Sequence, residues 1–344
     1  MANSTHAFLS ACRREPTSYT PIWLMRQAGR YMEDYRKLRA QHDFLDLCKK
    51  PDLAAEITIT PVDRLGVDAA ILFADILLIL EPMGVGLEYP KGDGPVIHRP
   101  VRSGKDVDGL KDFAPVTELE FVYDAVRKIV KALKNKVPLI GFAGAPFTLA
   151  SYLIEGGGSR NYVHTKKLFY GAPEAWRRLM ERLVKVVSGY LNCQIAAGAQ
   201  AVQLFDSWAG CLTPGDYEQF AMPYTKAVID ALTPGVPVIN FSTGTAGALK
   251  QVRAAGGDVI GLDWRVNLDE GWATVGYDVA VQGNLDPVAL FAAPKEIKAR
   301  AGDILRRAAG RPGHIFNLGH GVLPETPVEH VIALVDAVHE LSAR

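Results

Sequence analysis

Short apolar runs rich in β-branched residues recur along the chain, and longer segments with helical spacing separate them. Runs of this length without polar alternation are typical of strands buried on both faces of a parallel sheet. We count eight such runs: 22–25, 69–73, 137–142, 201–205, 236–241, 259–262, 279–282 and 315–318. Eight strands that alternate with helices favour an α/β fold of the (β/α)8 TIM barrel type, and a doubly wound open sheet is the alternative.

The segments between the runs carry helix signals. Segments 119–133, 175–197 and 217–232 place apolar residues three and four positions apart, which predicts amphipathic helices. At Asp286-Pro287 and Thr326-Pro327 a side chain that can cap a helix precedes a proline, and this pattern predicts the first turn of a helix.

One segment departs from this alternation. Within 84–101, the tripeptide Gly92-Asp93-Gly94 lies between two short alternating stretches and predicts a β-hairpin inserted after the second strand. No linker rich in Pro, Gly or Ser divides the chain, so residues 1–344 are predicted to form a single domain.

A barrel places its functional groups at the carboxyl ends of its strands. In this chain each of the eight runs is followed by polar or glycine residues: Arg26, Asp75, Gly144, Asp206-Ser207, Ser242-Thr243, Asp263, Asn284 and His320, in chain order. This ordering favours the barrel over the open sheet.

The charges of the chain balance, because 38 Lys and Arg oppose 38 Asp and Glu. A protein that binds nucleic acid or an anionic membrane surface normally needs a basic field, so neither partner is expected. A charged ligand must instead be bound by a local cluster of charges.

The four cysteines lie far apart, without a C-x-x-C motif or a neighbouring histidine. This spacing disfavours a structural zinc site or a disulfide framework, and no metal is expected. The N-terminal residues lack the pattern of a signal peptide, and no apolar run is long enough to span a bilayer. We therefore expect a cytoplasmic protein with reduced thiols.

Basic residues concentrate just after the first run. Arg26 and Arg30 are four positions apart, and Arg36, Lys37 and Arg39 follow. Guanidinium groups bind carboxylates bidentately and stay charged when desolvated. Arg26 and Arg30, flanked by apolar and small residues, predict a site for carboxylates or phosphates, whereas Arg36 and Lys37 are interpreted as a solvated helix face.

Asp75 lies in the apolar stretch 72–78, where an ionised carboxylate is costly unless a partner stabilises it. Two interpretations stay open. Asp75 is either a cap or a structural partner of a buried arginine, or a carboxylate held to meet a cation or several N–H donors.

Glycines punctuate the segment 141–159, which also contains Tyr152, but their spacing fits neither a dinucleotide fingerprint nor a P-loop. They predict close approach of the backbone to a large flat ligand. Segment 242–247 is a weaker candidate for a phosphate site at a helix N-terminus. His320 stands between two glycines after the last run and is a candidate for acid–base work or ligand binding. The other histidines that we weighed are interpreted as structural.

Several motifs together resemble the uroporphyrinogen decarboxylase family across essentially the whole chain. The resemblance rests on the stretches 21–30, 73–77, 141–158, 204–207 and 317–321, in that order and spacing. It implies a (β/α)8 barrel, a homodimer and no cofactor. The functional positions that it implies are Arg26, Arg30, Arg39, Asp75, Tyr152, Ser207 and His320.

One position departs from the family pattern. Some members have a histidine after the serine, and this chain has Trp208. A catalytic imidazole at that position is thereby excluded, and a packing or ligand-contacting role is expected.

The family resemblance implies removal of carbon dioxide from the four acetate arms of uroporphyrinogen III, giving coproporphyrinogen III. Its eight carboxylates explain a demand for arginine, and protonation of an electron-rich pyrrole supplies the electron sink without a cofactor. Asp75 is then expected to accept the pyrrole N–H groups and stabilise the ring cation. Arg26, Tyr152 and His320 are the candidate proton donors.

Two other functions are compatible with such a cleft. A corrinoid-dependent methyltransferase of the same fold would need zinc ligands, and the chain has no H-x-C motif. A non-catalytic tetrapyrrole-binding protein would not need the carboxylate of Asp75.

Overall fold

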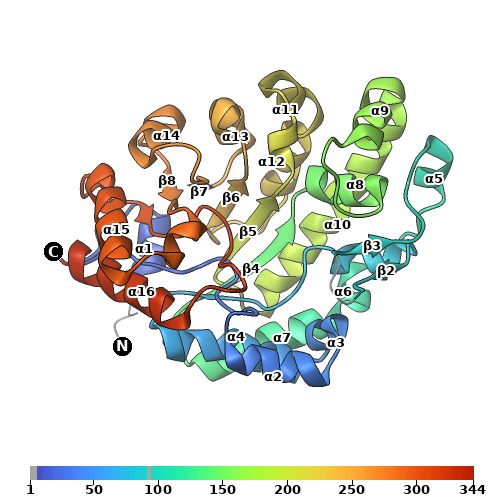
Figure 1. Cartoon of the computed structure of the whole chain (residues 1–344). Helices are drawn as coiled ribbons and strands as arrows, with labels where there is room; N and C mark the ends of the chain where they lie inside the picture. Colours follow the sequence, from blue (N-terminus) through green and yellow to red (C-terminus); the bar gives the residue numbers. More distant parts are fainter. Residues whose placement is uncertain (1–5, 91–93) are drawn as a thin grey trace.

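The computed structural model describes residues 6–90 and 94–344. At its centre a curled sheet of seven parallel strands runs in the order β1-β4-β5-β6-β7-β8-β9, with helices packed around its outside (Figure 1). The strands are β1 (Ala70–Ile71), β4 (Leu139–Gly144), β5 (Ala201–Asp206), β6 (Val238–Ser242), β7 (Val259–Gly261), β8 (Ala280–Gln282) and β9 (His314–Ile315). Each strand overlaps one of the predicted apolar runs.

The first run, 22–25, is the exception, because it forms no regular strand. Ile22 makes one isolated parallel bridge with Phe316, and its carbonyl accepts a hydrogen bond from Asp68 N at 2.8 Å. These contacts place the run between the two edge strands of the sheet, β9 and β1.

Side chains take three of the four backbone donors in this run, while Trp23 N donates to Phe316 O at 3.3 Å. Ile22 N donates to Asp68 Oδ2, Leu24 N to Gln27 Oε1, and Met25 N to Asn317 Oδ1. The predicted strand is therefore replaced by an extended segment that side chains hold in place.

Helices surround the sheet, and most of them cover its outer face (Figure 1). In chain order they are α1 (Ala7–Cys12), α2 (Glu33–Gln41), α3 (Phe44–Lys49), α4 (Pro51–Leu65), α5 (Gly104–Asp108), α6 (Pro115–Glu118), α7 (Glu120–Leu133), α8 (Pro146–Glu155), α9 (Val163–Gly171), α10 (Pro173–Ala197), α11 (Pro214–Phe220), α12 (Met222–Asp230), α13 (Leu249–Ala255), α14 (Leu268–Val275), α15 (Pro294–Ala308) and α16 (Val328–Ser342). Short 3₁₀ helices are η1 (Leu78–Met83), η2 (Ala209–Cys211), η3 (Ala246–Ala248) and η4 (Pro287–Phe291). Helices α7 and α10 agree with the predicted segments 119–133 and 175–197.

The helix predicted over 217–232 is wrong as a single element. It is interrupted at Ala221, between α11 and α12, where the backbone leaves the helical region. Pro223 lies in the first turn of α12 and has no N–H to donate to the preceding turn, so the helix starts anew there.

The two predicted proline starts differ. Asp286 caps η4, a 3₁₀ rather than an α-helix, by accepting a hydrogen bond from Val288 N at 2.9 Å. The predicted cap by Thr326 is wrong, because α16 begins at Val328 after Pro327, without a side-chain cap. The Thr326 hydroxyl is instead buried without a hydrogen-bond partner among the described residues.

In the segment after β1, strands β2 (Leu87–Glu88) and β3 (Val96–Ile97) pair antiparallel, with Leu87 opposite Ile97. The predicted turn at Gly92-Asp93-Gly94 lies mostly outside the described residues. Tyr89 directly follows β2, and its hydroxyl donates to Asp75 in the loop after β1.

Two apolar clusters lie on opposite faces of the curled sheet, because side chains alternate along each strand. The larger cluster fills the space between the strands and the outer helices. The smaller one joins inward-facing residues such as Ile140, Ile239 and Val259 with Phe8 and Cys12 of α1, which closes one end of the interior. Within residues 6–90 and 94–344, no helix combines the length and apolar character needed to cross a membrane.

Candidate active site

A cavity of about 510 Å³ opens where the carboxyl ends of the strands meet. Functional sites of barrel-like α/β proteins lie at this end of the strands. Six of the seven predicted site residues line the cavity: Arg26, Arg30, Asp75, Tyr152, Ser207 and His320. Much of the remaining wall is aromatic and consists of Tyr35, Phe44, Phe73, Tyr89, Phe142, Phe205, Trp208 and Phe241. The cavity therefore suits a large, flat ligand with several charged arms.

Asp75 lies between β1 and η1, and its two carboxylate oxygens have different partners. Oδ1 accepts hydrogen bonds from Leu77 N at 2.8 Å and from Tyr89 Oη at 2.5 Å. Both of these hydrogen bonds end on Oδ1 and none in the part of the chain that the structure describes ends on Oδ2, which belongs to a half-buried side chain on the cavity wall. Asp75 thus organises its own turn and also leaves one oxygen for a ligand.

The pKa of Asp75 is set by opposing effects. Burial raises it above its usual value, while the hydrogen bonds from Tyr89 and Leu77 and the charge of Arg26 lower it. The carboxylate is therefore held in an apolar setting by a small number of donors.

Arg26 follows the first run in a left-handed conformation, with a φ of 60°. This conformation costs a non-glycine residue about 1 kcal/mol and has to be imposed by its surroundings. The last loop supplies the restraint: Val322 N donates to Met25 O at 2.9 Å, and a Cβ at Gly321 would collide with the Arg26 side chain. Gly321 is thus needed so that Arg26 can pass along this loop into the cavity.

The other basic residues of the N-terminal cluster separate into two groups. Arg30 lines the cavity, with an exposed side chain. Arg39 does not line it, because its guanidinium donates to His42 O at 2.8 Å at the end of α2. Arg36 binds the carbonyls of Arg30 and Tyr31, and Lys37 pairs with Glu33 on the exposed face of the helix. The geometry therefore places Arg26 and Arg30, but not Arg39, at the candidate site.

Tyr152 on α8 and Ser207 after β5 both line the cavity. The Tyr152 ring packs at 5.6 Å from that of Trp208, and burial raises the pKa of Tyr152 to about 12. Trp208 both packs and lines the cavity, as expected from the departure at this position.

Hydrogen bonds fix the turn that carries Ser207. Thr148 Oγ1 donates to Asp206 Oδ1 at 2.7 Å and accepts from Trp208 N at 3.2 Å. Thr243 Oγ1 donates to Ser207 O at 2.6 Å. Asp206 itself is fully buried, so it supports this turn from behind the cavity wall. Burial also raises its pKa to about 6.

His320 lines the cavity, but its environment disfavours the protonated form. Burial lowers its pKa from 6.5 to about 4, and the charges of Arg26 and Arg265 add to this effect. The neutral imidazole at neutral pH makes His320 a poor proton donor. The flanking glycine has a steric reason that sequence did not reveal, because a Cβ at Gly319 would collide with the backbone of Trp264.

The remaining polar residues at the strand ends form structure around the cavity. Asp263 accepts hydrogen bonds from Gly244 N at 2.6 Å and from Arg265, while Ser242 pairs with Thr245. The carboxylate of Asp263 therefore already accepts from one backbone donor, Gly244 N, of the segment 242–247 that was predicted as a phosphate site. Among the described residues, no group of three or more His, Cys, Asp or Glu side chains is arranged to hold a metal ion.

Sequence reasoning missed Tyr89 and the aromatic wall. Tyr89 lies in the segment interpreted only as a hairpin arm, 14 positions from Asp75. No motif marks this pairing, and only the folded chain brings the two side chains together. The only sequence signal for Tyr89 was the alternating pattern of the hairpin arm, which places Leu87 on one face of that arm.

The cavity thus combines one carboxylate, an aromatic wall and two arginines. A comparison with known protein families was made on the sequence. The sequence model described as "Uroporphyrinogen decarboxylase (URO-D)" matches residues 3–341. The chain belongs to the uroporphyrinogen decarboxylase family. Among curated relatives, a "Uroporphyrinogen decarboxylase" of Solibacter usitatus is 54% identical and covers 99% of each chain. Another, of Carboxydothermus hydrogenoformans, is 57% identical over 98% of this chain and 96% of its own.

Solved structures with low sequence identity share the fold of this uroporphyrinogen decarboxylase family member. A methyltransferase from Methanosarcina mazei superposes with a TM-score of 0.83 at 20% identity, over 97% of both chains. A putative vitamin-B12 independent methionine synthase from Listeria monocytogenes gives 0.60 at 12% identity, over 96% of this chain and 99% of its own. These likenesses support the curled α/β fold and carry no statement about activity.

Proposed function

We propose that the chain removes carbon dioxide from the four acetate arms of uroporphyrinogen III, giving coproporphyrinogen III on the route to haem and other tetrapyrroles. Asp75 carries this proposal, because it presents one free carboxylate oxygen inside an aromatic cavity that also holds Arg26 and Arg30. Such a cavity meets the two needs of this substrate, which are an anion for its pyrrole N–H groups and cations for its carboxylates.

The reaction uses the pyrrole as its own electron sink. Protonation of the ring carbon next to the one that bears the acetate arm converts the pyrrole to an iminium cation. The C–C bond to the carboxylate then breaks, carbon dioxide leaves, and the electron pair forms an exocyclic methylene while the ring nitrogen becomes neutral. A proton added to the methylene carbon completes the methyl group and, after loss of the first proton, restores the pyrrole.

Different residues on the cavity wall have different roles in this proposed reaction. Ionised Asp75 stabilises the ring cation more than the neutral substrate, which lowers the barrier to its formation. Arg26 and Arg30 bind carboxylate arms, with Ser207 and Tyr152 as hydrogen-bonding partners. A guanidinium and a tyrosine whose pKa is raised to about 12 are both weak acids, so Arg26 or Tyr152 protonates the ring only in direct contact with it. Neutral His320 holds a carboxylate arm or orients Arg26.

We also propose that the reaction needs no cofactor. We propose that the curled sheet and the 22–25 segment close into a (β/α)8 barrel, with β2 and β3 as an inserted hairpin. The enzyme is further proposed to act in the cytoplasm as a homodimer. The cofactor proposal rests on the chemistry above, since the substrate supplies its own sink. The barrel proposal rests on the contacts of Ile22 with both edges of the sheet.

The proposed function is tested by anaerobic incubation of the protein with uroporphyrinogen III after treatment with a chelator. We expect successive products with seven, six, five and four carboxylates, resolved by chromatography after oxidation to porphyrins. No carboxylate loss would contradict the proposed activity, and loss only before chelation would contradict cofactor independence.

A further inference from the structure

Tyr89 contacts Asp75 from a part of the chain that lies outside the main sheet. Its hydroxyl donates to Asp75 Oδ1 at 2.5 Å, and both residues line the cavity. Tyr89 is none of the residues to which the family resemblance assigns a role.

Aromatic packing determines where this hydroxyl lies. The Tyr89 ring packs on Phe44 of α3, with 4.8 Å between ring centroids, and Phe44 packs edge-on against Phe73 at 6.1 Å. Phe73 is two positions before Asp75 on the same loop. The ring is thus held against the segment that carries the carboxylate, so its hydroxyl is pre-oriented for the hydrogen bond.

The hydrogen bond also determines which oxygen a ligand meets. With Leu77 N and Tyr89 Oη both on Oδ1, the carboxylate cannot rotate without losing two hydrogen bonds. Oδ2 is then the oxygen left toward the cavity.

We propose that Tyr89 is a positioning residue for Asp75, holding Oδ1 at the wall so that charged Oδ2 is presented to the pyrrole N–H groups of the substrate. This inference rests on the proposed function. It assigns to Tyr89 a part in the chemistry, because its hydroxyl fixes the orientation of the Asp75 carboxylate and lowers the pKa that burial raises.

Few of the titratable groups around Asp75 can stabilise its charged form, so the hydrogen bond from Tyr89 matters for its pKa. Within residues 6–90 and 94–344, the titratable groups that lie near enough to interact with it are Arg26, Tyr35, Cys48, Tyr89, Tyr152 and Tyr190. Arg26 is the cation among them, and burial raises the pKa of each of the others, so these stay neutral at neutral pH. Burial and Asp75 raise the pKa of Tyr89 far enough that it remains a donor across this range.

The test is the pH dependence of kcat/KM for Tyr89→Phe, which keeps the ring on Phe44 and removes only the hydroxyl. Without this donor the charged carboxylate is less stable, so the acidic limb of the profile moves to higher pH. A hydrogen bond to a charged group contributes about 1.5 kcal/mol or more, so kcat/KM on that limb should fall about tenfold, with a smaller change on the plateau.

Tyr170→Phe is the matched control. It also removes a tyrosine hydroxyl that donates to a carboxylate, in this case Asp216 at 2.9 Å, but on the exposed surface. Its profile should superimpose on that of the unchanged protein.

A second measurement does not depend on turnover. Infrared titration of the ligand-free protein follows the protonated carboxyl band that Asp75→Asn removes, and we expect this band to appear at higher pH in Tyr89→Phe. An unshifted band together with an unshifted limb would overturn the positioning role. A collapse of the plateau without a shift would also overturn it and would assign Tyr89 to proton transfer. If the unchanged protein shows no decarboxylation, the proposed function fails, while the infrared titration still decides whether Tyr89 controls Asp75.

Discussion

At the scale of single residues, the candidate site depends on side chains whose charge is controlled by their neighbours. The pKa of Asp75 is raised by burial, and the hydrogen bonds from Tyr89 and Leu77 and the charge of Arg26 oppose this effect. His320 is kept neutral by burial and by Arg26. Sequence identified both residues, but not their protonation, because that depends on desolvation and on groups far away in the chain.

His320→Asn tests the protonation of this histidine. Because the pKa of His320 lies near 4, its imidazole is already neutral around pH 6.5, and its removal should delete no limb of the kcat/KM profile near neutral pH. Loss of a hydrogen-bonding partner should lower kcat/KM about tenfold at all these pH values. Disappearance of a limb near pH 6.5 in the variant would show that a protonated His320 acts in the reaction.

At the scale of elements, strand positions could be predicted from sequence because strands buried on both faces are marked by apolar runs. The first run forms no regular strand despite its apolar pattern, since the side chains of Asp68, Gln27 and Asn317 take three of its four backbone donors. Several residues that follow the runs, namely Arg26, Asp75, Ser207 and His320, line the cavity, and their roles in the reaction stay predictions. Arg39 and the Tyr89–Asp75 pair were not resolved, since helix orientation and contacts between distant segments leave no local pattern.

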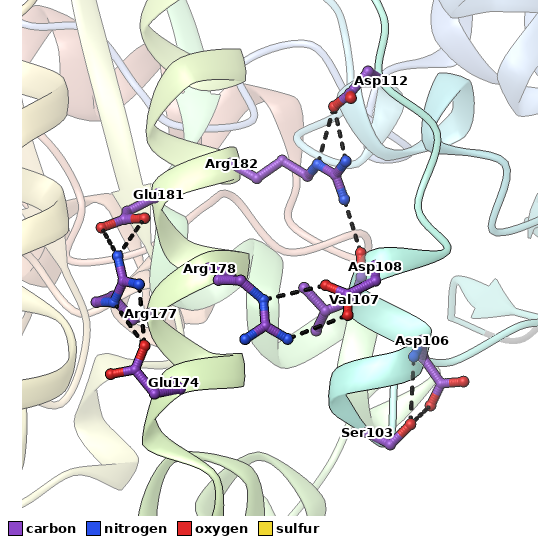
Figure 2. A network of polar contacts seen from close by, with 10 residues as sticks. All are labelled: Ser103, Asp106, Val107, Asp108, Asp112, Glu174, Arg177, Arg178, Glu181 and Arg182. Atoms are coloured by element: carbon purple, nitrogen blue, oxygen red, sulfur yellow. Dashed lines mark hydrogen bonds and ion pairs between the residues drawn. The ribbon is translucent and has the colours of Figure 1, made fainter.

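Helix α10 shows how an outer helix holds an irregular segment, since its arginines reach the chain around α5 (Figure 2). Arg182 donates to Val107 O at 2.7 Å and to Asp112 Oδ1 at 2.9 Å, and Arg178 pairs with Asp108. Arg177 contacts only Glu174 and Glu181 of its own helix among the residues drawn.

Arg182→Ala should therefore lower the free energy of unfolding by about 1.5 kcal/mol, because a charge-assisted hydrogen bond to a backbone carbonyl is lost. Arg177→Ala is the control and should cost less than about 0.5 kcal/mol, since exposed pairs within a helix contribute little. Denaturant unfolding measures both. Equal losses in the two variants would contradict a tethering role for Arg182.

At the scale of the whole molecule, the chain has no net charge although its proposed substrate is anionic. The positions of a few arginines explain how such a chain can bind an anion. The 38 basic residues are cancelled over the chain by 38 acidic ones, so no net field attracts an anion from a distance. Arg26 and Arg30 stand on the cavity wall, whereas Arg36 and Lys37 are engaged elsewhere.

Substrate binding should therefore depend on the local pair Arg26 and Arg30, and added salt or substitution should change it through these two residues. Arg30→Ala should raise KM for uroporphyrinogen about tenfold, because one charge-assisted contact with a carboxylate is lost. Lys37→Ala removes an equal charge on the exposed face of α2 and should leave KM within about twofold of its value. Steady-state kinetics at two salt concentrations measures this, and equal effects of the two substitutions would indicate general attraction instead of a defined contact.

The proposed reaction depends on stabilisation of the cationic pyrrole by the Asp75 carboxylate, and the turnover of Asp75→Asn measures this stabilisation. The asparagine keeps the size of the side chain and one oxygen but removes the charge that opposes the ring cation. We expect kcat for the first decarboxylation to fall by about 10³-fold, while substrate binding, measured anaerobically, changes far less. A kcat near that of the unchanged protein would contradict the account.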